Sequence, residues 1–294
     1  MISDITLGQY FPGNSRIHKL DPRTKILLAV LYIVAVFIAN NPASFLMLAI
    51  ITLVIICVSG ISFGVLWKSI KPILIILLIT ASINIFMTVG SSDPIVDFWI
   101  ITIYWEGIVK AFFMAFRVIM LILGTSILLT YTTTPISLTD GIESLLSPLK
   151  RFGVPVHTFA MMMSIALRFI PTLIEETEKI MNAQKSRGAD FTTGSIVQRA
   201  KALIPLLIPL FVSSFKRAEE LATAMECRCY RGDNNRTKLV KLEFRKNDYV
   251  WLAGFVIITV IMILLSVLPY QYNVDSAIYK AFFYRIGGAQ YYGN

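Results

Sequence analysis

Long apolar runs dominate the chain and alternate with short polar segments. Five of them approach the roughly 20 residues that an α-helix needs to cross the hydrocarbon core of a bilayer. They cover residues 20–39, 43–58, 70–89, 108–130 and 249–268. We therefore predict an all-α integral membrane protein with about five transmembrane helices. Arg23 and Lys25, at the start of the first run, are expected to extend toward water.

The region between the fourth and fifth runs has a different pattern, because apolar residues recur there every three or four positions. Such a stripe is typical of a helix with one buried face. One stripe covers residues 170–181. The other consists of Ile196, Ala200, Leu203, Leu207, Phe211, Phe215, Ala218, Leu221 and Met225. We predict two long amphipathic helices here, preceded by a shorter helix over residues 137–150 that weakens near Pro148.

Two apolar patches in this region, at residues 159–174 and 202–215, leave a second interpretation open, in which they are a sixth and seventh span. That topology would place a basic connector outside the membrane, against the positive-inside rule. Pro171, Pro205 and Pro209 also interrupt the patches, and a proline inside a helix costs about 3 kcal/mol. We therefore favour amphipathic helices on the cytoplasmic side.

Composition and charge agree with a membrane protein. Of the 294 residues, 56% are hydrophobic and 15% charged, whereas a soluble domain carries about 25% charged residues. These values exclude a disordered protein, a nucleic-acid-binding arm and an ordinary cytosolic enzyme. The net charge is +9, and 23 of the 27 Lys and Arg residues fall on one side if the spans alternate. Because basic loops stay inside, the N-terminus is expected in the cytoplasm and the C-terminus outside.

Spans and charges together predict three parts of the chain. Residues 1–133 would form an N-terminal membrane bundle of four spans. Residues 134–247 would form a cytoplasmic region of amphipathic helices. Residues 248–294 would hold the last transmembrane helix and an external tail.

The sequence carries no motif of an enzyme that works alone. It contains no phosphate-binding G-x-x-x-x-G-K-[ST] loop, and neither H-E-x-x-H nor G-x-S-x-G. Its two histidines, His18 and His157, lie in separate contexts. We expect no catalytic residue, no metal and no cofactor.

The two amphipathic helices end on similar residues. The motifs are Ser186, Arg187 and Gly188 in the first, and Cys227, Arg228 and Cys229 in the second. They fit simple capping, since an arginine suits the negative end of a helix and glycine suits the residue after it. They also fit docking, because a guanidinium presents five donors in one plane to an acidic groove of a partner. Cysteine lacks the backbone freedom of glycine, so we expect the second helix to continue toward Gly232.

One charged residue, Arg117, lies inside the fourth apolar run. A charge at that depth is costly and often functional. We expect either a structural pairing with a buried carboxylate or backbone carbonyl, or a contact with a partner in the membrane.

Three segments resemble the transmembrane T component of energy-coupling factor (ECF) transporters, which are ABC-type importers. The first is Leu-Asp-Pro-Arg-Thr-Lys at residues 20–25. The second is Leu-Arg-Phe-Ile-Pro-Thr-Leu at residues 167–173, which continues to Gly188. The third is Ile-Pro-Leu-Leu-Ile-Pro at residues 204–209, which continues to Arg228. The resemblance covers nearly the whole chain in span order.

The resemblance implies a non-catalytic scaffold and energy-coupling subunit of an importer for vitamins or transition-metal ions. In that family, coupling helices join two ABC-type ATPase subunits, identical or different, to a membrane-embedded substrate-binding S component. Two small-Arg-small motifs dock on the ATPases, and by position these are residues 186–188 and 227–229. Arg117 is then a candidate contact of the S component. The cysteines at 227 and 229 depart from the family's usual alanine and glycine. The alternative is a stand-alone channel or secondary transporter.

Overall fold

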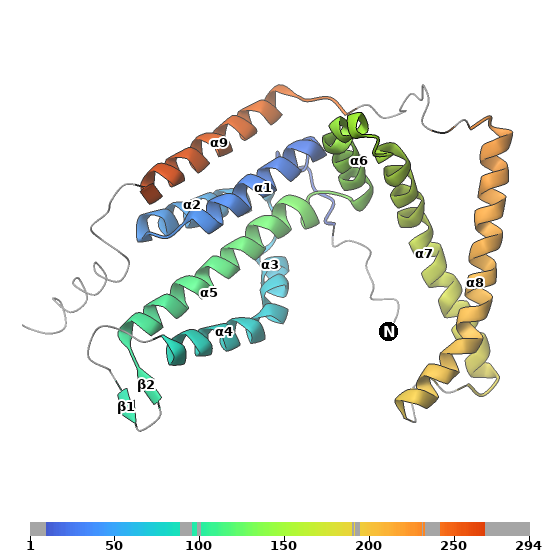
Figure 1. The fold of residues 1–294 in the computed structure, drawn as a ribbon, viewed down its shortest axis with the longest axis horizontal. Helices are drawn as coiled ribbons and strands as arrows, with labels where there is room; N and C mark the ends of the chain where they lie inside the picture. Colours follow the sequence, from blue (N-terminus) through green and yellow to red (C-terminus); the bar gives the residue numbers. More distant parts are fainter. Residues whose placement is uncertain are drawn as a thin grey trace, which may run out of the picture. The chain divides into compact units, whose positions relative to one another are not determined.

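The computed structural model describes residues 10–88, 96–98, 101–189, 191, 195–230, 232 and 242–267. Over these residues the chain is helical apart from one short hairpin (Figure 1). The α-helices are α1 (Pro22–Ile38), α2 (Pro42–Ser59), α3 (Phe63–Ile70), α4 (Leu74–Met87), α5 (Trp105–Thr125), α6 (Pro135–Leu146), α7 (Val156–Ser186), α8 (Ile196–Cys227) and α9 (Lys246–Val267). The predicted all-α fold is confirmed.

Three short helical segments and a hairpin complete the described secondary structure. Segments η1 (Lys71–Ile73) and η3 (Ser147–Phe152) are 3₁₀ turns, and η2 (Ser126–Tyr131) is a π-helical turn that ends α5. Strands β1 (Val96–Phe98) and β2 (Ile101–Ile103) pair antiparallel. The hydrophobic pattern did not indicate this hairpin.

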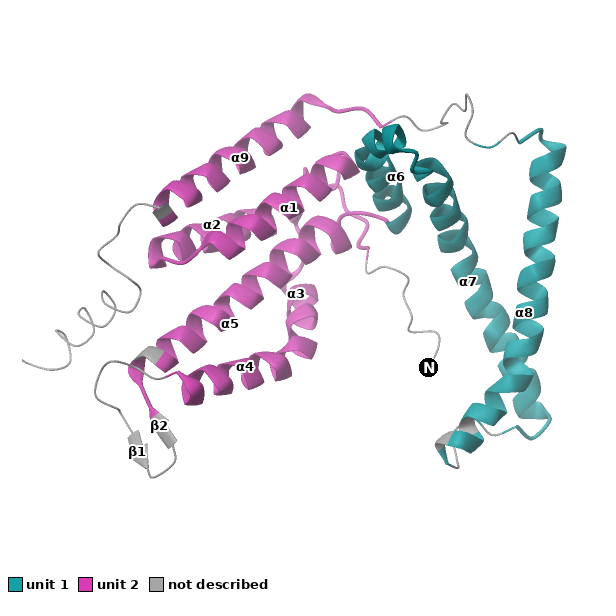
Figure 2. Ribbon diagram, in the orientation of Figure 1, with its two compact units in different colours: residues 1–9, 135–241 teal, residues 10–134, 242–294 magenta. Residues whose placement is uncertain are grey.

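The chain divides into two compact units, which Figure 2 shows in different colours. Unit 1 consists of residues 1–9 and 135–241 and contains α6, η3, α7 and α8. Unit 2 consists of residues 10–134 and 242–294 and contains the remaining elements. The part that the sequence predicted as an external tail lies outside the described residues from residue 268 onward.

Five helical segments are long and apolar enough to cross a membrane by length and composition. They are Pro42–Ser59, Phe63–Met87, Gly107–Tyr131, Val156–Ser186 and Lys246–Ser266. Four of them coincide with predicted spans. The fifth is α7. Its apolar first half continues without a break into the predicted amphipathic helix, so that the two form one helix. The predicted first span corresponds instead to α1, which is shorter than expected.

The two ends of α1 explain its length of 17 residues, about 26 Å at 1.5 Å per residue. The helix begins at Pro22, where proline's fixed φ suits the first helical position. Asp21 caps it, because its carboxylate accepts a hydrogen bond from Arg23 N at 2.9 Å. The helix ends at Ile38, since Ala39 is already extended and Pro42 starts α2.

Tyr32 on α1 links three helices in the core of unit 2. Its hydroxyl donates to the Met120 carbonyl of α5 at 2.8 Å and lies 2.7 Å from Thr52 Oγ1 of α2. The ring passes close to Gly124 of α5, where a Cβ would lie 2.1 Å from Tyr32 Cε1. Only glycine therefore allows this approach.

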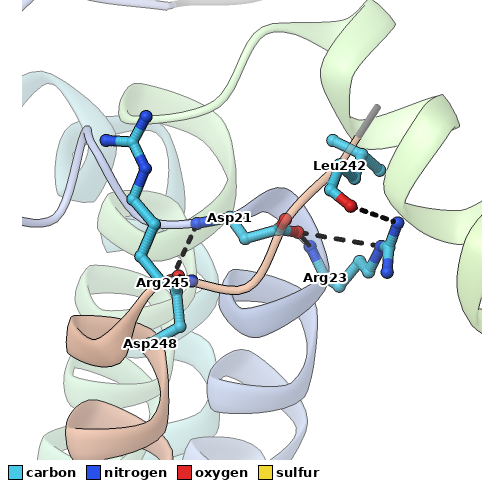
Figure 3. A network of polar contacts seen from close by, with 5 residues as sticks. All are labelled: Asp21, Arg23, Leu242, Arg245 and Asp248. Atoms are coloured by element: carbon cyan, nitrogen blue, oxygen red, sulfur yellow. Dashed lines mark hydrogen bonds and ion pairs between the residues drawn. The ribbon is translucent and has the colours of Figure 1, made fainter. Parts of the chain in front are cut away.

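A buried carboxylate, Asp248, connects the starts of α1 and α9 (Figure 3). Its Oδ1 accepts from Asp21 N at 2.9 Å, and its Oδ2 accepts from Arg245 N at 2.7 Å. Arg23 reaches the same segment, because its Nη2 donates to the Leu242 carbonyl at 3.3 Å. Backbone donors at both helix starts are thus satisfied by side chains instead of water.

Lys25 is buried within unit 2, contrary to the expectation that it extends toward water. It is only 2% exposed. Its Nζ donates to the Thr132 carbonyl at 2.6 Å and to the His18 carbonyl at 3.2 Å. A buried ammonium needs such acceptors, so its side chain turns inward to them.

In unit 1, helices α7 and α8 run in opposite directions and cross (Figure 1). At the crossing, the Glu176 carboxylate of α7 accepts hydrogen bonds from Ser213 Oγ and from Arg217 Nη2 of α8, the latter at 2.7 Å. Both helices are continuous through their prolines, with 31 and 32 residues. The prolines therefore do not divide them as the sequence suggested.

The apolar stripe of α8 is exposed, whereas the sequence predicted a buried face. Leu203, Leu207, Phe211 and Phe215 are 44%, 58%, 66% and 63% exposed. Within unit 1, helix α8 packs against α7. The helical periodicity was correct, but no part of unit 1 that the structure describes buries this surface.

Helices α7 and α8 end in the same hydrogen-bonded turn. In α7, Gly188 N donates to Lys185 O at 2.9 Å and Ala189 N to Gln184 O at 3.0 Å. In α8, Cys229 N donates to Glu226 O at 2.8 Å and Tyr230 N to Met225 O at 3.0 Å. Both patterns are Schellman motifs, in which the residue after the C-cap is left-handed.

This turn ends α8 earlier than the sequence predicted. The helix stops at Cys227 and does not continue toward Gly232. Cys229 itself adopts the left-handed conformation, with φ of 57°, in the place where α7 has Gly188 with φ of 88°. The satisfied carbonyls of the last turn outweigh a cost of roughly 1–2 kcal/mol for a left-handed residue other than glycine.

We predict that Cys229→Gly stabilises the end of α8 by about 0.5–1 kcal/mol, because glycine removes the left-handed strain. Native-state hydrogen exchange of the amides in the last turn of α8 measures this change. The matched variant Cys227→Gly, at the last helical residue, should slow no amide and should destabilise the turn by about 0.3 kcal/mol. Equal effects of the two substitutions would contradict the assignment of strain to Cys229.

We predict that Asp248→Asn lowers the free energy of unfolding by about 2 kcal/mol, since it removes the charge from two buried hydrogen bonds. Thermal unfolding of the full chain in detergent measures the loss. The control is Glu243→Gln, the same carboxylate-to-amide change at an exposed position nearby, which should stay within about 0.5 kcal/mol. A silent Asp248→Asn would show that the network does not hold α1 to α9.

Candidate functional site

The candidate site consists of the two arginine-bearing ends of the crossed helices in unit 1. Arg187 is the C-cap of α7, with φ of −89° and ψ of 6°. Arg228 is the C-cap of α8, with φ of −90° and ψ of 14°. The two arginines thus leave their helices with nearly identical backbone geometry. Because α7 and α8 run in opposite directions, their C-terminal ends lie at opposite ends of the pair (Figure 1).

Both arginine side chains are exposed. Among the residues that the structure describes, neither guanidinium has a hydrogen bond or an ion pair. An arginine that served only to cap its helix would donate to the last carbonyls. Here the backbone amides of the Schellman turns occupy those carbonyls instead. The guanidinium donors are therefore available to another molecule.

The residues on either side of the arginines are small and exposed. Ser186 is the last residue of α7, and its hydroxyl donates back to Asn182 O at 3.1 Å. At Gly188, no atom lies within 4 Å of the position that a Cβ would occupy. Cys227 and Cys229 are exposed free thiols. Small neighbours leave open space around each guanidinium, as close approach to a protein groove requires.

The two ends differ in the charge around the arginine. In the last turn of α7, exposed Lys185 adds a second positive charge close to Arg187. In the last turn of α8, exposed Glu226 stands two residues before Arg228. The last helical turns before the two arginines therefore differ in charge, although their backbones match.

Glu176 joins the two helices where they cross. Its carboxylate bonds both Ser213 and Arg217, and its side chain and that of Arg217 are 22% and 32% exposed. A half-buried, bidentate anchor at a helix crossing restricts sliding of one helix along the other. This contact of Glu176 could not be identified from the sequence, because Ser213 and Arg217 lie 37 and 41 residues away.

Arg117 lies in unit 2 and does not belong to the pair of helix ends. Its Nη2 donates to the Ala39 carbonyl and, at 3.2 Å, to Asn40 Oδ1 in the loop between α1 and α2. Its guanidinium also lies over the Phe45 ring, 5.4 Å from the centroid. A backbone carbonyl was one of the predicted partners. The contact with a second protein stays a prediction.

The motif at residues 20–25 has a structural explanation in unit 2. Asp21 caps α1 and Pro22 is its first residue. The side chains of Arg23 and Lys25 donate hydrogen bonds to the backbone carbonyls of Leu242 and Thr132, respectively. Asp248, which was not predicted as a functional or structural residue, completes this network (Figure 3). An acidic residue in the first turn of a predicted helix could have been found, since a carboxylate there is a common acceptor for the amide at the helix start.

No group of three or more His, Cys, Asp or Glu side chains that could hold a metal ion occurs in the described part of the chain. The pair of cysteines beside Arg228 thus has no third ligand within those residues. The chemistry that the site offers is recognition by arginine.

Comparison with known proteins assigns the chain to a family. The family model described as "Cobalt transport protein" (CbiQ) matches residues 13–239. The chain is 54% identical over 250 residues to the energy-coupling factor transporter transmembrane protein EcfT of Clostridium kluyveri, covering 85% of this chain and 92% of that protein. The protein of the same name from Acidaminococcus fermentans is 53% identical over 267 residues, covering 90% and 97%.

A more distant relative extends the match over almost its whole length. The EcfT protein of Bacillus subtilis is 46% identical over 266 residues, which cover 90% of this chain and 99% of the relative. The family model covers helices α1 to α5 of unit 2 and both arginine-bearing helix ends of unit 1. This chain therefore belongs to the family of energy-coupling factor transporter transmembrane proteins, and it is a multi-pass membrane protein.

Proposed function

We propose that this chain is the scaffold and energy-coupling subunit of an ECF importer, and that its two arginine-bearing helix ends dock on two ABC-type ATPase subunits. The observation that carries the proposal is the repetition of one cap geometry. Arg187 and Arg228 both follow the last helical residue, both are exposed, and both stand before a left-handed residue. A repeated arginine end is suited to a dimeric partner with two similar grooves.

The guanidinium suits this docking because it binds carboxylates through two parallel hydrogen bonds. The small side chains beside each arginine allow a groove to close around it. Since the two ends lie at opposite ends of the crossed pair (Figure 1), each ATPase subunit would receive one of them. Closure of the ATPase dimer on ATP would then move the two ends together and displace the helices.

The chain itself would not catalyse a reaction. It lacks the phosphate-binding loop of an ATPase, so ATP hydrolysis would belong to the partner subunits. The exposed apolar stripe of α8 includes Leu207, Phe211 and Phe215. It would face the S component or lipid, because an apolar surface of this kind is typical of a protein or membrane contact. The S component would bind the substrate, a vitamin or a transition-metal ion.

The positive-inside rule gives the orientation of this assembly. Residues 134–247, with their high density of Lys and Arg, would lie on the cytoplasmic side where the ATPases are. The N-terminus would be cytoplasmic and the C-terminus external. Helix α7, although long and apolar enough to span by composition, would then lie at the cytoplasmic side as a coupling helix.

The test is co-purification of the ATPase subunits with the chain. Arg187→Glu combined with Arg228→Glu should abolish recovery of the ATPases, because each substitution replaces an attractive charge by a repulsive one. Each single variant should retain partial recovery through the other end.

Matched controls place the same charge reversal on an exposed lysine of the same helix, away from its end. Lys179→Glu in α7 and Lys216→Glu in α8 should retain most of the complex at physiological salt. Undiminished recovery with the double arginine variant would exclude docking through these ends. If the lysine variants lose as much ATPase recovery as the arginine variants, net charge alone explains the result and specific docking is excluded.

A further inference from the structure

We propose that the start of α1, residues 21–25, is the junction at which displacement of unit 1 enters the membrane bundle, with Lys25 and Arg23 as its positioning residues. This inference rests on the proposed function, because it assumes that the ATPases move unit 1. The chain passes between the two units at three places, which we call passages: after residue 9, after Thr134 and after residue 241.

Lys25 holds the second of these passages. Its Nζ donates at 2.6 Å to the carbonyl of Thr132, two residues before the chain leaves unit 2. Lys25 is 2% exposed, and Thr132 is also 2% exposed. A charged donor at this distance in a buried site is among the stronger hydrogen bonds of a protein.

Arg23 and Asp248 hold the third passage (Figure 3). Arg23 Nη2 donates at 3.3 Å to the carbonyl of Leu242, the first residue after the chain returns to unit 2. The Arg23 guanidinium also lies over the Phe244 ring, 5.2 Å from its centroid. Asp248 then fixes Arg245 N and Asp21 N with its two oxygens. The returning segment is thus bonded to the start of α1 before α9 begins.

The first passage is bonded to the same group of residues. Lys25 Nζ donates to the His18 carbonyl at 3.2 Å, and His18 Nε2 lies 3.0 Å from the Phe11 carbonyl. Phe11 N in turn donates to Tyr131 O at 3.1 Å. The entering segment is therefore connected to Lys25 and to the end of η2, directly before the second passage.

All three passages thus converge on one turn of one helix, although they are far apart in sequence. Helix α1 packs against α5 and α9. A displacement of the passages would therefore act on the start of α1 and move the bundle through that helix. Contiguous hydrogen-bond networks that end on a rigid helix are a physical basis for such coupling.

The test is hydrogen–deuterium exchange of the chain in complex with its ATPase subunits, with and without a non-hydrolysable ATP analogue. In the wild-type complex, we expect the analogue to change exchange both in α7 and α8 and in the segments 10–38 and 242–267. Lys25→Met keeps the length of the side chain and removes its donors. It should retain the response of α7 and α8 and lose that of unit 2.

Two further variants separate coupling from stability. Tyr32→Phe removes a buried interhelical hydrogen bond from the same helix but touches no passage, so it should keep the response of both units. Arg23→Gln changes a partly exposed side chain, so it should destabilise the fold less than Lys25→Met does. It should weaken the response of residues 242–267 more than that of residues 10–38.

The possible outcomes distinguish the junction from the proposed function. If Lys25→Met and Arg23→Gln both leave the response of unit 2 intact, the junction is refuted. If Tyr32→Phe abolishes that response equally, general loosening explains the effect and the junction is refuted as well. A wild-type response in α7 and α8 with none in unit 2 would refute the junction alone. A wild-type complex without any response in α7 and α8 would overturn the proposed function, and the junction with it.

Discussion

A helix leaves four amides at its start and four carbonyls at its end without partners inside the helix, and in a mostly apolar protein few waters can supply them. The places where this chain satisfies them are the places that determine its architecture. At the ends of α7 and α8, backbone amides of the following residues satisfy the carbonyls. At the starts of α1 and α9, the carboxylates of Asp21 and Asp248 satisfy the amides.

The two solutions have different consequences. A Schellman turn uses only backbone groups, so the side chain at the C-cap stays free, and in both long helices that residue is an arginine. The carboxylate caps instead use side chains, and Asp248 joins α1 to α9 because it also accepts from Asp21 N, 227 residues away in sequence. The first solution leaves two guanidinium groups exposed in unit 1. The second fixes the segments of unit 2 through which the chain leaves and returns.

Much of the fold could be predicted from the sequence, because long apolar runs and helical stripes report local structure directly. The extents of α7 and α8 were less predictable. Proline is unfavourable within a helix on average, yet Pro171, Pro205 and Pro209 lie inside helices long enough to tolerate the one hydrogen bond that each proline removes. The predicted end of α8 was wrong because the hydrogen bonds of the turn outweigh the strain at Cys229.

The two arginine motifs could be found from sequence because each is local. The partners of Lys25 could not, since Thr132 lies 107 residues away and a lysine at the edge of an apolar run resembles one that extends toward water. Asp248 is 227 residues from Asp21. The exposure of the apolar stripe of α8 could not be predicted either. Periodicity shows which residues share a face of the helix, but it does not show which molecule covers that face.

Cryo-electron microscopy of the chain bound to its ATPase subunits can show whether the two arginine ends dock on two separate subunits. We expect Arg187 in a groove of one ATPase subunit and Arg228 in the corresponding groove of the other. A map in which both ends contact the same subunit, or in which either guanidinium faces solvent, would contradict it.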